Sequence, residues 1–186
     1  QAIATDPAIP QAPFVRATSS FVEAELKAEG IIRKIPAFTR FLKTAALSSG
    51  ELLSYENISS DSGVPVTTVK EHYKILEDTM IGYRLEPWLE SKKRKAIATG
   101  KFYFFDLGVL NFISNQKQIG SENSPVWGNR FENYIINEVI CANQYQRRKQ
   151  NINYWRSTSQ FEVDLIFGST AIEIKSTRRA TEAHLK

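Results

Sequence analysis

The chain has 186 residues, of which 42% are hydrophobic and 24% are charged, and its formal net charge is +4. That length can bury a real core as one large domain or two small ones. The mild basic excess permits an acidic partner such as nucleic acid without requiring one. Cys141 is the single cysteine, which excludes an intramolecular disulfide. No apolar run approaches the roughly 20 residues that span a bilayer, and no signal peptide is recognisable, so we expect a cytoplasmic protein without membrane contact.

The first predicted domain covers residues 18–113 and follows a linker or tail at 1–17. The tail is predicted because its three prolines have no clear hydrophobic period. The domain begins with a helix at about 18–30, where a serine cap precedes acidic residues and Gly30 ends the pattern. A second helix is predicted at about 36–48, because apolar residues recur there at helical spacing.

The next segment has the pattern of a helix-turn-helix. A short polar helix is predicted at about 55–61, then a turn at Gly63, then a longer helix that ends near Asp78. Two predicted strands, 82–89 and 101–108, enclose a basic loop. Strands with a charged tip after this motif would make it a winged helix-turn-helix.

Candidate DNA-binding residues lie at two places in this domain. The outward face of the second helix is mixed in charge, whereas the loop between the strands is a run of cations better suited to phosphate contacts. The candidates are Thr67, Thr68, Lys70, Lys74, Lys92, Lys93, Arg94 and Lys95. The alternatives are that the motif is an interdomain packing unit and that the cations form a solvated loop.

A second domain is predicted over 114–186, after a polar boundary at about 114–125. Its elements are a long amphipathic helix at 126–147 and strands at 152–156, 161–167 and 171–176, with a further helix start at 178–186. The apolar face expected for the long helix comprises Phe131, Ile135, Ile136, Val139 and Ile140.

The last two predicted strands carry the residues that suggest chemistry. Because side chains alternate across a strand and the connection is short, an antiparallel hairpin can bring Asp164 close to Glu173, with Lys175 alongside. Two carboxylates can hold Mg²⁺, which keeps several waters and coordinates a substrate phosphate. A lysine there can bind the phosphate or orient the attacking water. The alternative is a solvated strand face with a cross-strand ion pair, and we expect Glu162 to be an edge residue or salt-bridge partner.

A third acid can join this cluster from the long helix. Glu132 lies at the edge of the expected apolar face, because Ile135, Ile136 and Val139 follow it at i+3, i+4 and i+7. A carboxylate in that position is costly unless it is paired, hydrogen-bonded or near a metal. A helix packed on the sheet could therefore aim Glu132 at Asp164 and Glu173.

These residues resemble a known superfamily. The pattern D-x(8)-E-x-K at Asp164, Glu173 and Lys175, preceded by a helix with an inward Glu, resembles the PD-(D/E)xK nucleases, which have the restriction-endonuclease-like fold. From about Phe21 to the end, the order of longer landmarks is similar to the C-terminal region of archaeal and bacterial AAA-type ATPases. The landmarks are FLKTAALSSGELLSYENISSDSGVPVTTVKEHYKILEDT, KFYFFDLGVLNFI, GNRFENYIINEV, FEVDLIF and AIEIKST.

The resemblance implies both a fold and a function. The implied fold is α+β, with a helical winged helix-turn-helix unit followed by a restriction-endonuclease-like α/β core. The implied site has metal ligands at Asp164 and Glu173, a supporting acid at Glu132 and a catalytic Lys175, with Mg²⁺ or Mn²⁺ as the cofactor. The implied partners are DNA and an N-terminal ATPase domain of the same polypeptide.

The sequence departs from the pattern at two points. Val163 stands before Asp164 in place of proline, which supplies no ligand, and the chain stops before a further strand of the core, so we expect a C-terminal truncation. No G-x-x-x-x-G-K-[ST] motif occurs, so ATP is not expected in this chain. The expected function is DNA binding with metal-dependent phosphodiester hydrolysis. The alternatives are a non-catalytic module that binds DNA or a protein, and pure protein docking through the helical half.

Overall fold

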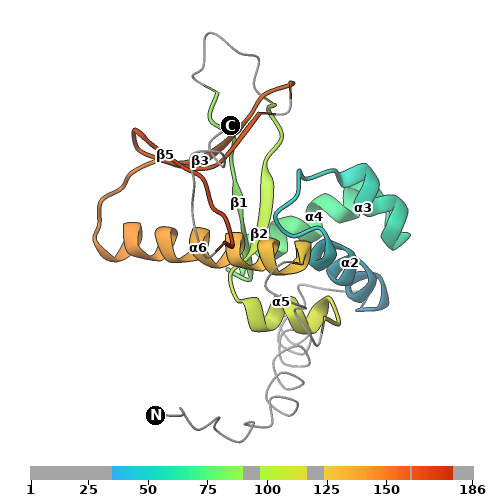
Figure 1. Cartoon of the computed structure of the whole chain (residues 1–186). Helices are drawn as coiled ribbons and strands as arrows, with labels where there is room; N and C mark the ends of the chain where they lie inside the picture. Colours follow the sequence, from blue (N-terminus) through green and yellow to red (C-terminus); the bar gives the residue numbers. More distant parts are fainter. Residues whose placement is uncertain (1–34, 90–96, 117–123, 160, 178–186) are drawn as a thin grey trace, which may run out of the picture.

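The structure is a computed structural model that describes residues 35–89, 97–116, 124–159 and 161–177. Within these residues lie five helices and two small antiparallel sheets, so the fold is α+β. The helices are α2 (Ile35–Leu47), α3 (Tyr55–Ser62), α4 (Val66–Asp78), α5 (Leu107–Ile113) and α6 (Pro125–Tyr145). The strands are β1 (Gly82–Leu85), β2 (Lys101–Phe104), β3 (Ile152–Arg156), β4 (Glu162–Phe167) and β5 (Thr170–Ile172). In Figure 1, α2, α3 and α4 lie on one side of the β1–β2 hairpin and the second sheet lies on the other.

Helices α2, α3 and α4 pack into the first core. The side chain of Ser54 caps α3 by accepting the backbone N–H of Asn57. Gly63 ends α3 with a φ of 65°, a left-handed conformation that glycine adopts without steric cost. The turn leads into α4, which buries Val69 and Tyr73. The chain order is the predicted one, with a helix, a glycine turn, a second helix and then a hairpin.

The β1–β2 hairpin has a hydrophobic core on each side. The two strands pair antiparallel, with Leu85 opposite Lys101, and all four residues of β2 are buried. Side chains alternate along β2, so Phe102 and Phe104 join the helical core and Tyr103 joins the other one. The buried residues of this second core are Leu85, Tyr103, Ile136, Tyr154 and Leu165. The hairpin therefore contributes side chains to the hydrophobic cores of both halves of the chain.

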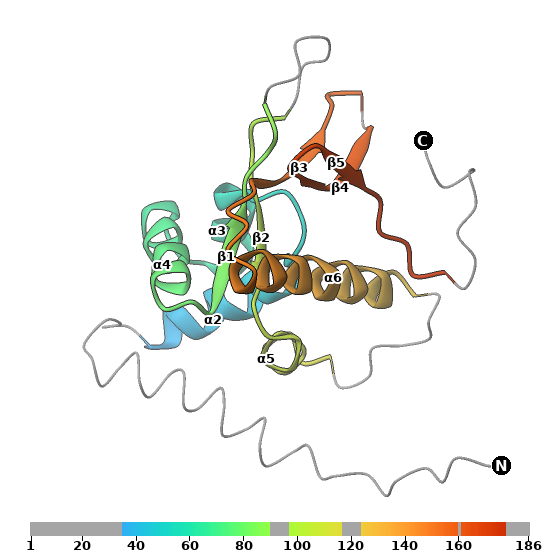
Figure 2. The same ribbon diagram turned by 90° about the vertical axis from the view of Figure 1, so that its left-hand side faces the viewer.

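The second sheet has the strand order β3-β4-β5 and is antiparallel throughout. Its edge strand β3 is tied to the segment after β1: the N–H of Trp88 donates to the carbonyl of Tyr154 at 2.7 Å, and the N–H of Tyr154 donates to that of Glu86 at 3.2 Å. Figure 2 shows the hairpin standing between the helical unit and this sheet, with α6 running below the sheet. Backbone pairing thus joins the two halves directly.

The buried face of α6 differs from the predicted apolar face. Its buried residues are Arg130, Asn133, Ile136 and Asn137, whereas Phe131 and Ile135 are partly exposed. The polar members bond to the helical half: Arg130 Nε donates to Asn111 Oδ1 at 2.7 Å, and Asn137 Nδ2 donates to the Phe105 carbonyl at 2.7 Å. The helix lies between two units, so one stripe satisfies polar groups of the first while Ile136 packs into the second core.

Two elements differ in extent from the sequence expectation. Residues after Asp106 form helix α5, although the strand prediction extended to residue 108; the Asp106 side chain caps this helix by accepting the N–H of Val109 at 2.7 Å. Strand β5 ends at Ile172 and not near residue 176. The reason is local, because the N–H of Ile174 donates to the Asp164 carboxylate at 2.7 Å instead of continuing the backbone ladder.

Several predicted segments lie outside the described residues. These are the tail at 1–17, the helix at 18–30, the closing helix at 178–186 and most of the basic loop. In the part of the chain that the structure describes, no helix has the length and apolar character needed to cross a membrane.

Candidate carboxylate–lysine site

Asp164 lies on β4, the central strand of the second sheet. β4 pairs with β5 so that Leu165 faces Ile172. One further step in the same register brings Asp164 opposite Glu173, which is the juxtaposition predicted from the sequence. The Asp164 side chain is buried, and its Oδ2 accepts the N–H of Ile174 at 2.7 Å. That backbone bond fixes the orientation of the carboxylate.

Glu173 and Lys175 lie just beyond β5 and form an ion pair. Lys175 Nζ is 2.6 Å from Glu173 Oε1, and the Lys175 side chain is 47% exposed. The hydrogen bond that Lys175 donates to Glu173, together with the charge on Asp164, raises the pKa of Lys175 above its ordinary value. The two side chains share a face, as strand alternation predicts, while Ile172 and Ile174 pack against the second core.

The Asp164 carboxyl has a strongly perturbed acidity. Burial raises its pKa from 3.8 to about 6, and the charges on Glu132 and Glu173 add to the rise, against the opposing effects of the Ile174 N–H and Lys175. Glu132 reaches this region from α6. The structure therefore brings all four predicted residues, Glu132, Asp164, Glu173 and Lys175, into one electrostatic neighbourhood.

Glu132 is held by two residues of the hairpin that sequence reasoning missed. Tyr103 donates its hydroxyl to Glu132 Oε1 at 2.6 Å, and Lys101 Nζ lies 3.4 Å from the same oxygen. Lys101 also contacts Glu162 Oε1 at 2.6 Å, and Arg156 contacts the other oxygen of Glu162 at 3.4 Å. Glu162 is thus a salt-bridge partner, as expected, and Glu132 is a bonded carboxylate and not a free one.

Lys101 is the most unusual member of this network because its side chain is only 5% exposed. Burial by itself would lower the pKa of this lysine, but the charges on Glu132, Glu162 and Asp164 hold that pKa above its ordinary value. A signal for Lys101 was present in the sequence. In the segment Lys101–Phe104, strand alternation places Lys101 on the face of Tyr103, opposite Phe102 and Phe104.

A cleft of about 460 Å³ opens beside this network. Its lining residues are Gly50, Glu51, Leu52, Lys101, Arg156 and Glu162. Glu162 pairs with both of the cations in the lining. The cleft therefore offers little net positive charge to a phosphate, and it makes Lys101 and Glu162 reachable from solvent.

The predicted metal pair can be tested against the chemistry of its donors. Among the described residues, no three His, Cys, Asp or Glu side chains come together as a group that could hold a metal ion. Asp164 and Glu173 each use one oxygen in the bonds described, so one oxygen of each remains as a donor. Mg²⁺ commonly takes one or two carboxylates and completes its shell with waters and phosphate oxygens, so this pair fits that ion. When bound, Mg²⁺ would lower the pKa of a water and offset charge on a phosphate.

The predicted DNA-binding residues of α4 lie on its outer face. Thr67, Lys70 and Lys74 are exposed, and Thr68 is partly buried. Lys74 Nζ pairs with Asp78 Oδ2 at 2.9 Å, and Lys70 Nζ stands 5.3 Å from the centre of the Tyr55 ring. Lys92, Lys93, Arg94 and Lys95 lie outside the described residues. DNA contact by any of these side chains stays a prediction.

The fold is α+β with two hydrophobic cores, and residues from both halves of the chain form the network around Glu132. In comparisons with protein families, residues 6–119 match a domain of unknown function (DUF8612) and residues 127–186 match a second domain of unknown function (DUF4143). The chain belongs to the DUF8612 family, whose match covers more than half of its length. Neither the curated proteins nor the solved structures gave a match. Lys101 and Tyr103 fall in the first region, and Glu132 and Asp164 fall in the second.

Proposed function

We propose that this chain binds DNA as the C-terminal portion of an AAA-type ATPase and that Asp164, Glu173 and Lys175 form a Mg²⁺-dependent phosphodiesterase site. The observation that carries the proposal is the buried Asp164, whose pKa is raised to about 6 by burial and by neighbouring carboxylates. Such a carboxylate is ionised at neutral pH at a cost in free energy, which a bound cation would offset. DUF4143 regions are commonly found with AAA ATPases, which supports the choice of partner domain.

Each residue has a separate task in this proposal. Asp164 and Glu173 supply the oxygen donors, and the Ile174 N–H keeps Asp164 oriented. Lys175 is half exposed and held by Glu173, so its ammonium can turn to a substrate phosphate once Glu173 is engaged elsewhere. Glu132, bonded to Tyr103 and Lys101, acts as a nearby negative charge and supports the site without holding the ion.

Contact with DNA is assigned to the helical half of the chain. The outer face of α4 carries Thr67, Thr68 and Lys70, and the basic residues 92–95 supply four cations to the phosphate backbone. Phosphate contacts of this kind position a protein without reading sequence. The proposal therefore predicts salt-sensitive binding with little sequence preference.

A non-catalytic DNA- or protein-binding module is the second candidate, and two observations favour it. Lys175 is already neutralised by Glu173 at 2.6 Å. Glu132 is occupied by Tyr103 and Lys101, which leaves Asp164 and Glu173 without a free third acid. In that case the site would be a nuclease scaffold used for binding, with the chemistry lost.

A cleavage assay tests the two candidates against each other. Supercoiled plasmid and single-stranded DNA are incubated with the chain in Mg²⁺ or Mn²⁺, alongside Glu173→Ala, Lys175→Ala and the matched surface variant Glu138→Ala. Glu138 is an exposed acid on α6 and should leave cleavage unchanged. Cleavage lost in the first two variants alone supports the phosphodiesterase. DNA binding without cleavage in all proteins supports the second candidate, and the absence of both rejects DNA as the partner and supports protein docking.

A further inference from the structure

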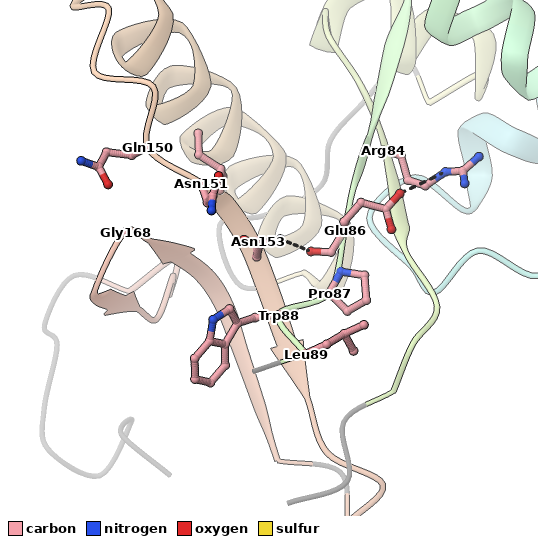
Figure 3. A pocket seen from close by; sticks show the side chains of 10 residues that line it. Arg84, Glu86, Pro87, Trp88, Leu89, Gln150, Asn151, Asn153 and Gly168 are labelled. Atoms are coloured by element: carbon pink, nitrogen blue, oxygen red, sulfur yellow. Dashed lines mark hydrogen bonds and ion pairs between the residues drawn. The ribbon is translucent and has the colours of Figure 1, made fainter. Parts of the chain in front are cut away.

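A second cleft, of about 590 Å³, lies where the segment after β1 meets the start of β3. Trp88 and Leu89 come from the first segment, and Gln150, Asn151 and Asn153 come from the second, with Gly168 of the β4–β5 turn at the rim. Figure 3 shows Trp88 near the start of β3, with Asn151 and Asn153 on that segment and Gln150 nearer to Gly168. The volume is within the range of small-ligand sites.

The walls of this cleft are tied together by hydrogen bonds. The N–H of Trp88 donates to the Tyr154 carbonyl at 2.7 Å, and Asn153 Nδ2 donates to the Glu86 carbonyl at 3.2 Å. Pro87, directly before Trp88, is buried and has a restricted φ. The indole therefore stands on a rigid backbone, so a ligand that stacks on it meets a pre-formed surface with little ordering cost.

The charges around the cleft favour a neutral ligand group. Arg84 is the cation among its lining residues, and Arg84 Nε already lies 3.2 Å from Glu77 Oε1 and 3.9 Å from Glu86 Oε1. Glu86 is 59% exposed and would repel a phosphate at this rim. An indole and the amides of Gln150 and Asn151 in the lining of one cleft instead suit a flat, uncharged group with hydrogen-bond donors and acceptors.

We propose that this cleft binds an unpaired nucleobase, with Trp88 as the stacking surface and Asn151 and Gln150 bonding to the edge of the base. Nucleobases stack on aromatic side chains with little dependence on sequence, and amides can both donate to and accept from a base edge. This inference rests on the proposed function, because a nucleic acid is what makes a base the expected flat ligand. If the cleft binds an unpaired base, the substrate of the proposed site is single-stranded nucleic acid.

Gly168, at the rim of the cleft, directly follows β4, the strand that carries Asp164. Gly168 is four residues beyond Asp164, which at ~3.3 Å per strand residue is roughly 13 Å along the sheet. A nucleic acid bound at this cleft would therefore pass the end of the β-strand on which Asp164 lies.

Fluorescence anisotropy on the full 186-residue chain tests the proposal with three labelled DNAs. They are a single-stranded oligothymidylate, a duplex of the same length and a single strand with abasic sites in place of bases. The variants are Trp88→Ala, Trp88→Phe and Asn151→Ala, and Asn151 is an exposed residue whose change carries little folding risk. Trp127→Ala is the matched control, because it removes an indole from a different pocket.

We expect Trp88→Ala to weaken oligothymidylate binding about tenfold, which is within the stacking contribution of a base on an aromatic side chain. Trp88→Phe should retain most of the affinity, and the duplex and abasic DNAs should bind all variants alike. Unchanged oligothymidylate binding in both Trp88→Ala and Asn151→Ala, with DNA still bound, would overturn the nucleobase site and leave the proposed function standing. Failure of the unmodified chain to bind any of the three DNAs would overturn the proposed function itself.

Discussion

Lys101 Nζ lies 2.6 Å from Glu162 Oε1, which joins a hairpin of the DUF8612 region to a strand of the DUF4143 region. The same ammonium is 3.4 Å from Glu132 on α6 and stands over the Tyr154 ring at 5.3 Å. One buried lysine thus contacts three elements of the second half. These bonds to Glu132 and Glu162 form only when the first half is packed against the second.

Lys101→Met should destabilise the chain by about 3 kcal/mol, because removing one partner of a buried ion pair leaves uncompensated carboxylates. Urea unfolding followed by circular dichroism measures the free energy of unfolding. Lys74→Met is the matched control, since Lys74 pairs with Asp78 on the surface, where a salt bridge contributes under about 1 kcal/mol. Equal losses in the two variants would mean that the Lys101 network stabilises no more than a surface pair.

Asp164→Asn should make the chain more stable at neutral and alkaline pH. The folded pKa of about 6 exceeds the unfolded value of 3.8, so the contribution of this group to stability is full below about pH 3.8 and is lost as pH rises through about 6. The free energy of unfolding of Asp164→Asn should exceed that of the unmodified chain by about 3 kcal/mol above pH 7, and the two values should converge near pH 4. Asparagine keeps an acceptor for the Ile174 N–H.

The groups that shift the pKa of Asp164 are Glu132, Glu173, Lys175 and the Ile174 N–H, and Lys101 and Tyr103 of the β1–β2 hairpin also interact with its charge. Thermal unfolding across pH 4–8 in the absence of divalent ions measures the difference. Glu138→Gln, on the exposed face of α6, controls for loss of a surface charge. An Asp164→Asn protein that is less stable than the original at pH 8 would contradict the assigned pKa.

Mg²⁺ should raise the thermal midpoint of the chain, because a ligand that binds the folded state alone stabilises it by mass action. At ten times the dissociation constant the gain is about 1.4 kcal/mol, or about 3–6 °C for a chain of this size. The rise should disappear in an Asp164→Asn, Glu173→Gln double variant and persist in Glu138→Gln. A rise that survives in the double variant would place the ion elsewhere.

Asp78→Asn should strengthen DNA binding, because Lys74 would no longer be neutralised by its partner at 2.9 Å. Lys70→Gln should weaken binding of all sequences alike and reduce the salt slope of the affinity by about 1, since one phosphate contact is lost. Anisotropy titrations over a range of salt concentrations measure both effects. If neither variant changes the affinity, α4 is not part of the DNA surface.

Local sequence pattern predicted most of the elements near the candidate site. Helical spacing of apolar residues placed α2, α4 and α6 within one or two residues of their ends, since each period is set by backbone geometry. Strand alternation and a short connection predicted that Asp164 and Glu173 would come together, because the register of a tight hairpin follows from its loop. Helix α5 was missed, since the aromatic run before it matched a strand.

Long-range packing accounts for what the pattern did not predict. Lys101 and Glu162 are far apart in the chain, and their contact depends on the hairpin being buried on both faces. The polar stripe of Arg130 and Asn137 on α6 has the same origin, because a helix between two units must satisfy polar partners that lie elsewhere in sequence. The sequence thus specified Asp164, Glu173 and Lys175 as neighbours. The packing of the two halves determined which other charges meet and how deeply Asp164 is buried.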